Sequence, residues 1–118
     1  MKVTYLAIPY TWNPNEAFNI ANKVAAELMN VGNIIFSPIS HSHPVADHLH
    51  PELRTSQEFW MHQDMEMIKR CDDVVLIVVG DDGEDLIKNS SGCQSEIKKA
   101  KELGMEIRRF HYLDLQTK

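Results

Sequence analysis

The chain has 118 residues, of which 43% are apolar and 25% charged, and its formal net charge is −5 at pH 7. These values predict one folded domain over residues 1–118 with a single core, and they argue against disorder. No apolar run approaches the roughly 20 residues of a membrane-spanning helix, the N-terminus does not resemble a signal peptide, and the acidic balance disfavours nonspecific nucleic-acid binding. We therefore expect a cytoplasmic domain that acts on a small molecule, without a membrane or nucleic-acid partner.

The first part of the chain alternates short strands with a helix. Residues 2–8 predict a buried strand, and Asn13 is a candidate N-cap for a helix whose apolar positions recur at helical spacing until Gly32. Residues 33–37 predict a second short strand. Residues 38–54 hold three prolines and four of the six histidines, and we expect them to be irregular.

The second part repeats this alternation. A helix is predicted from Thr55 to about Arg70, because residues 55–58 read as a capping box. Residues 73–79 predict a central parallel strand, since they are apolar at almost every position. The next ten residues, 80–89, carry four acids and predict a loop.

A third helix and a final strand complete the pattern. The helix begins near Ser90 or Ser91, where residues 91–94 read as a second capping box, and ends at Gly104. Residues 105–113 are more polar and predict an edge strand. Strands that alternate with helices indicate a single-domain, three-layer α/β sandwich with a parallel sheet of four to five strands, similar to flavodoxin or Rossmann folds.

Two acidic residues fall on faces that should be buried. Asp64 lies four residues from both Trp60 and Ile68 on the apolar stripe of its helix, and Glu96 borders the apolar stripe of the third helix. Each alone fits an ordinary acid, bonded to a backbone amide or solvated near a helix N-terminus. Together, near the carboxyl ends of the strands, they predict a pocket with two carboxylates, which suits chemistry at the anomeric carbon of a sugar.

Three further features leave alternatives open. Residues 90–92, Ser-Ser-Gly, are able to hold an anion such as phosphate at a helix start, but the same residues cap ordinary helices. His41 and His43 have the spacing to chelate a metal, although histidines in such segments more often serve as polar surface or substrate contacts, and we predict no metal. Cys71 and Cys93 lie on apolar stripes and are interpreted as packing residues.

Three segments in a fixed order match a known pattern. Residues 5–10 read Tyr-Leu-Ala-Ile-Pro-Tyr, Asp64 precedes the strand-opening residues 72–75 (Asp-Asp-Val-Val), and residues 90–97 fit Ser-x-Gly-x-x-x-Glu-Ile. In this order they resemble the motifs of the nucleoside 2-deoxyribosyltransferase-like superfamily, over nearly the whole chain. Residues 36–44 most resemble a branch of bacterial and phage proteins that carry a Ser-Pro-Ile-Ala-His-Ser-His-Pro block.

The resemblance implies the superfamily's fold and a role for each matching residue. Glu96 falls on the catalytic glutamate, which attacks C1′ of a (deoxy)ribosyl group, and Asp64 on the aspartate that contacts the sugar hydroxyl or assists proton transfer. Tyr5 falls on a tyrosine that lines the site. Ser90 and Gly92 fall on the signature that binds a 5′-phosphate in the related nucleotide hydrolases.

The sequence also departs from the superfamily's pattern. Ile8 stands where many members have glycine, and the residues after it replace a glycine-rich phosphate loop that contains arginine. We expect Ile8, Pro9 and Tyr10 to contact the substrate. His41 and His43 are expected to shape the base or phosphate end of the pocket.

These features predict an N-glycosidase or deoxyribosyltransferase that cleaves the base–sugar bond of a nucleoside or nucleoside monophosphate. Glu96 would form a glycosyl-enzyme intermediate and Asp64 would manage the proton of the departing base, with no metal or organic cofactor. One alternative is a nucleotide-binding module that keeps the pocket without turnover. Another is hydrolysis through a metal held by the histidine-rich segment.

The second helix carries more large apolar side chains than a small core requires. Trp60 and the methionines within residues 59–67, together with Phe18, predict self-association. The resemblance implies the same, since the superfamily's enzymes are homo-oligomers in which a neighbouring chain completes the pocket. We therefore expect at least a homodimer built on residues 59–67.

Overall fold

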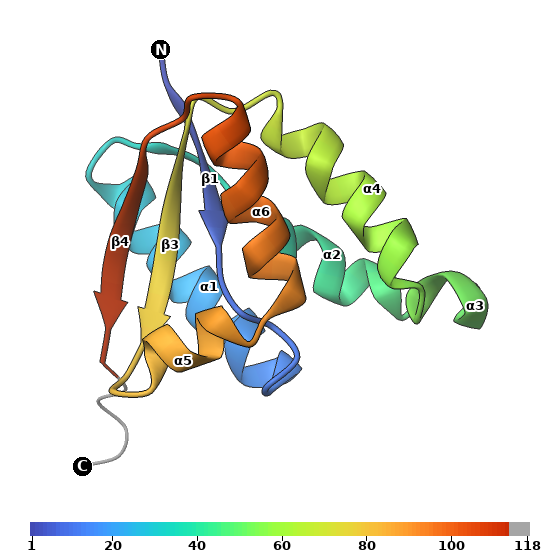
Figure 1. Cartoon of the computed structure of the whole chain (residues 1–118). Coiled ribbons are helices and arrows are strands. Elements are labelled where there is room, and N and C mark those ends of the chain that lie inside the picture. The colour runs from blue at the N-terminus through green and yellow to red at the C-terminus, as the bar shows by residue number, and fades with distance from the viewer. Residues whose placement is uncertain (114–118) are drawn as a thin grey trace.

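Four parallel strands form the centre of the protein in a computed structural model that describes residues 1–113 (Figure 1). The strands are β1 (Val3–Ala7), β2 (Ile34–Phe36), β3 (Asp73–Val79) and β4 (Ile107–Tyr112). They lie in the order β2-β1-β3-β4, and every pairing is parallel. The chain leaves β1 toward β2 on one side, and β3 pairs with β1 on the other. In open parallel sheets a ligand crevice forms at such a reversal, beyond the carboxyl ends of the two strands.

Within residues 1–113, six helices connect the strands and cover both faces of the sheet (Figure 1). They are α1 (Pro14–Asn30), α2 (Pro38–Ala46), α3 (Pro51–Arg54), α4 (Gln57–Ile68), α5 (Gly83–Lys88) and α6 (Ser91–Glu102). The predicted three-layer α/β sandwich is confirmed, with four strands. None of the described helices has the length and apolar character needed to cross a bilayer.

The core has two halves, one on each face of the sheet. Side chains of β1 and β3 alternate between them: Leu6 and Ile77 pack against α1, while Tyr5 and Leu76 pack against α4, α5 and α6. All four of these side chains are fully buried. The apolar run of β3 therefore reflects burial on both faces, as the sequence predicts for a central strand.

Polar side chains set the starts of the long helices. The Asn13 side chain accepts a hydrogen bond from the Glu16 amide at 3.2 Å, which confirms the predicted cap of α1. The two predicted capping boxes are each misplaced by one residue. Ser56 rather than Thr55 caps α4, and Ser90 rather than Ser91 caps α6, each accepting a hydrogen bond from an amide three residues later.

The prediction of an irregular segment over residues 38–54 is wrong, because it contains α2 and α3. Pro38 and Pro51 occupy first-turn positions, where a missing N–H group costs nothing because that group would have no partner inside the helix. Pro44 lies inside α2, where it removes a single backbone hydrogen bond from a helix of nine residues.

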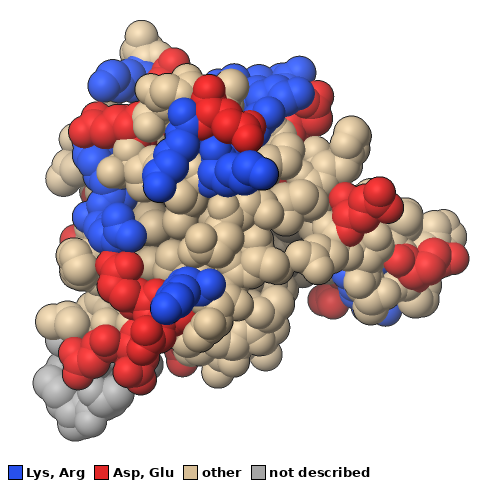
Figure 2. Space-filling model, in the orientation of Figure 1, with Lys and Arg blue, Asp and Glu red and all other residues tan. Residues whose placement is uncertain are grey.

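The expected loop at residues 80–89 likewise contains a short helix, α5. The four acids of residues 80–89 form an acidic patch on the surface near the carboxyl end of β3 (Figure 2). Arg109 of β4 binds Glu84 through two nitrogens, at 2.7 and 3.2 Å, and this contact lowers the pKa of the Glu84 carboxyl. An ion pair between residues far apart in the sequence therefore links α5 to the edge strand.

Candidate active site

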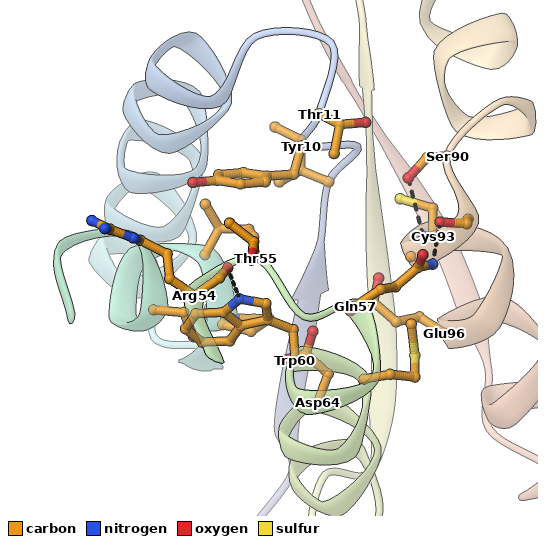
Figure 3. Close-up of a pocket in the computed structure, with 17 residues that line it drawn as sticks. Tyr10, Thr11, Arg54, Thr55, Gln57, Trp60, Asp64, Ser90, Cys93 and Glu96 are labelled. Carbon is orange, nitrogen blue, oxygen red and sulfur yellow. Dashed lines mark hydrogen bonds between the residues drawn. The ribbon is translucent and has the colours of Figure 1, made fainter. Parts of the chain in front are cut away.

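A cavity of about 410 Å³ opens near the carboxyl end of β1 (Figure 3). Its lining comes from four parts of the chain: residues 8–11 after β1, residues 38–42 at the start of α2, residues 54–64 across the α3–α4 junction, and residues 90–96 of α6. The cavity therefore occupies the crevice at which the strand order reverses. It is large enough to hold a small organic ligand.

The two acids on apolar faces both line this cavity. Asp64 projects from α4 and Glu96 from α6, two helices that pack against each other on the same side of the sheet. Glu96 is only 6% exposed, and the Tyr5 hydroxyl donates a hydrogen bond to its Oε2 atom. The fold thus brings together a carboxylate on each of two helices and a phenol from the central sheet.

Tyr5 holds the Glu96 carboxyl from the side of the sheet, by a hydrogen bond from its hydroxyl. It lies in the middle of β1, is fully buried, and does not line the cavity itself. Its ring packs at a tilt against Phe36 of β2, with 6.0 Å between the ring centres. The hydroxyl therefore reaches Glu96 from a rigid part of the sheet.

Burial changes the protonation of these three groups. It raises the pKa of Asp64 to about 6. It also raises the pKa of Glu96 to about 8, with the charge of Asp64 as a second cause and the Tyr5 hydrogen bond acting in the opposite direction. Burial and the two nearby carboxylates raise the pKa of Tyr5, so the phenol stays protonated and available as a donor. Near neutral pH, the carboxyl pair therefore holds a single proton.

The other residues predicted from the sequence divide into two groups. Those that line the cavity are Ile8, Tyr10, Ser90 and Gly92. Those outside the lining are Pro9, His41 and His43. Pro9 is buried, and its carbonyl accepts a hydrogen bond from the Trp12 indole at 2.7 Å. His41 is exposed on α2, whereas His43 is half-buried behind Tyr10.

Aromatic rings form the part of the cavity farther from Glu96. Tyr10 and Trp60 lie on opposite walls (Figure 3). The Trp60 indole donates a hydrogen bond to the Arg54 carbonyl at 2.8 Å. Trp60 is not among the residues predicted to line the pocket, although it precedes Asp64 by one helical turn and shares its face. Arg54, which also lines the cavity, carries no comparable signal in the sequence.

The start of α6 is already engaged in hydrogen bonds. The Ser90 hydroxyl caps the helix at the Cys93 amide, and the Ser91 hydroxyl accepts a hydrogen bond from Gln57 at 2.7 Å. Cys93 lines the cavity, but burial raises the pKa of its thiol to about 12, so it is not a thiolate at neutral pH. In residues 1–113, no three His, Cys, Asp or Glu side chains are grouped closely enough to hold a metal ion.

Solved structures that share this architecture include two 2-deoxyribosyltransferases. The 2-desoxiribosyltransferase of Leishmania mexicana superposes with a TM-score of 0.62 at 18% identity, covering 94% of this chain and 65% of the Leishmania chain. The 2-deoxyribosyltransferase of the psychrotolerant bacterium Bacillus psychrosaccharolyticus superposes with a TM-score of 0.64 at 23% identity, covering 92% of this chain and 72% of the Bacillus chain. The protein therefore has the α/β fold of the 2-deoxyribosyltransferases.

The chain belongs to the family described as "Domain of unknown function (DUF1937)", which matches residues 2–111. No curated protein matches it. The similarity to the two solved structures confirms, for the fold, the superfamily resemblance drawn from the sequence.

Proposed function

We propose that this protein cleaves the base–sugar bond of a nucleoside or nucleoside monophosphate, as an N-glycosidase or a deoxyribosyltransferase. The observation that carries the proposal is the buried Glu96 carboxyl, held by Tyr5 and placed in one cavity with Asp64. A carboxylate in a site with little water is an effective nucleophile toward an anomeric carbon, and a second carboxyl provides the proton exchange that such a reaction needs.

The reaction has two steps. The single proton of the pair resides mainly on Glu96, and the reactive form is the minority form in which Asp64 holds it instead. In that form the ionised Glu96 attacks C1′ as the C1′–N bond breaks, and the bonding electrons leave with the base, which receives the proton from Asp64 directly or through water. Water or a second base then attacks C1′ and displaces Glu96, while Asp64 takes up the proton of the attacking group. Two inversions give net retention at C1′, and no metal or organic cofactor takes part.

The walls of the cavity support a place for each part of such a substrate. The faces of Tyr10 and Trp60 suit a planar base, since aromatic rings stack on every nucleobase. Ser90 and Gly92 at the start of α6 provide donors for a 5′-phosphate. Arg54 is the one positively charged side chain among the described lining residues, and its guanidinium points away from Ser90, at the opposite end of the cavity (Figure 3). These contacts support nucleosides and their monophosphates as the substrate class.

The test is base release from a panel of ribonucleosides, deoxyribonucleosides and their monophosphates, followed by chromatography. We expect at least one member to give free base, and a second base added to the reaction to yield a new nucleoside of unchanged anomeric configuration. An intact panel throughout, with purified folded protein, would contradict the proposal.

A binding module without turnover is the second candidate. It is supported by Ile8, whose side chain fills part of the cavity wall where many superfamily members have glycine. In that case a nucleotide raises the melting temperature and is recovered unchanged.

We further propose that the protein is at least a homodimer, formed through residues 59–67 of α4. Met67 is 36% exposed on this helix, and Met61 and Met65 are half-buried. Trp60 instead faces the cavity and Phe18 stacks on His43, so these two rings have partners within the chain. Light scattering at tens of micromolar should give the mass of two or more chains, and the mass of one chain with full activity would contradict both self-association and a shared pocket.

A further inference from the structure

The histidine-rich segment meets the candidate site at one point. His43 of α2 lies with its Nδ1 atom 2.6 Å from the hydroxyl oxygen of Tyr10. Its ring stacks on Phe18 of α1, with 4.4 Å between the ring centres and 24° between the planes. Tyr10 lines the cavity, and His43 does not. The hydrogen bond to Tyr10 therefore connects His43 to the cavity wall.

These contacts restrict the Tyr10 side chain. Tyr10 belongs to the loop between β1 and α1, so no regular element fixes its ring. The bond to His43 ties the hydroxyl on the side away from Glu96, and the ring is left to form the cavity wall (Figure 3). The bond persists in either state of the imidazole, since a neutral Nδ1 accepts from the phenol and a protonated Nδ1 donates to it.

We propose that His43 is a positioning residue that fixes the Tyr10 ring as the wall against which the base stacks. This inference rests on the proposed function, because it needs a planar ligand in the cavity. A fixed wall stabilises the bound substrate and the transition state equally, since the base remains stacked in both. Loss of the His43 contact therefore raises KM and leaves kcat unchanged.

The experiment is a double-mutant cycle on base release. Tyr10→Phe removes the hydroxyl, and His43→Phe removes Nδ1 while keeping a ring to stack on Phe18. Each change should raise KM about 3- to 10-fold. The KM of the double variant should not exceed that of the single variant with the higher KM, because both changes remove the same hydrogen bond. His43→Asn, whose amide lies near the place of Nδ1, should restore KM to within about twofold of wild type. His48→Phe repeats the substitution at an exposed histidine just beyond α2 and should change nothing.

Additive effects of the two changes overturn the proposal, as does a fall in kcat with KM unchanged. If His43→Phe does not fold, as judged by its thermal melting curve, the cycle is built from Tyr10→Phe and His43→Leu instead, because leucine also lacks Nδ1 and keeps an apolar side chain against Phe18. A wild type that releases no base contradicts the proposed function, and the cycle is then measured as the affinity for free adenine by calorimetry. Non-additive losses of affinity support the positioning role in that case, and additive losses or the absence of binding overturn it.

Discussion

Glu96→Gln is expected to lower the rate of base release by about 10³-fold or more, because a neutral amide cannot attack C1′. The substitution keeps the size of the side chain and an oxygen that accepts the Tyr5 hydrogen bond, so the fold should be preserved. The measurement is kcat for base release, with thermal melting as the check on folding. Glu102→Gln makes the same change at an exposed position of α6 and should leave kcat unaltered.

Asp64→Asn separates the roles of the two acids. If Asp64 delivers the proton to the base, its loss slows substrates whose base needs that proton and spares those with an electron-poor base that leaves unprotonated. Glu96→Gln slows both kinds of substrate equally. Equal rates of base release in wild type and Glu96→Gln would rule out the nucleophile assigned here, and a uniform effect of Asp64→Asn would rule out the assigned acid.

We expect the pH dependence of kcat/KM to be bell-shaped, with a rising limb near pH 6 and a falling limb near pH 8. These limbs follow from the pKa of about 6 for Asp64 and of about 8 for Glu96, which belong to one interacting pair. The active form carries one proton, since the reaction needs one ionised carboxylate and one acid. The two limbs belong to the pair, and the falling limb is the loss of its last proton, which Asp64 carries in the reactive form. Asp64→Asn leaves no acid to lose that proton and should abolish the falling limb. A wild-type rate that rises steadily to pH 10 would contradict the paired mechanism.

The same shift links pH to stability. The pKa of Glu96 rises from 4.5 in the unfolded chain to about 8 in the folded protein, so the folded state binds this proton more tightly. The free energy of unfolding should therefore fall as the pH rises from about 4.5 to 8. Glu96→Gln carries no titrating group and should lose this contribution to the pH dependence. Its melting temperature should exceed that of wild type by about 5 °C or more at pH 9 and match it near pH 4.5.

Most of the architecture could be predicted because it depends on local signals. The apolar run of β3 and the caps at Asn13 and near Ser90 indicate strands and helix starts without knowledge of the rest of the chain. The helices α2 and α3 were missed because proline serves both to end a helix and to begin one. Pro38 and Pro51 begin helices, because the residues that follow each of them are helical.

The candidate site could be predicted only in part. Asp64 and Glu96 are indicated by acidic side chains on apolar helix faces, which is a pattern along one helix at a time. The contact between Tyr10 and His43 joins residues 33 positions apart and depends on how α2 packs across α1. The place of Arg54 in the lining depends in the same way on the packing of α3. Such contacts between elements have no periodic signature in a single sequence.

One side of the cavity is part of the core and the other is not, so the two sides differ in how freely their residues can change in evolution. Tyr5 and Glu96 are embedded in the core, so changes around them disturb the sheet. The opposite wall is formed by residues 38–42 at the start of α2 and residues 54–60 across the α3–α4 junction, few of which are buried. Insertions and substitutions there can alter the accepted base or sugar while the reacting groups stay in place. Relatives with other substrates should therefore differ mainly in these two segments, which are also the first target for engineering a new specificity.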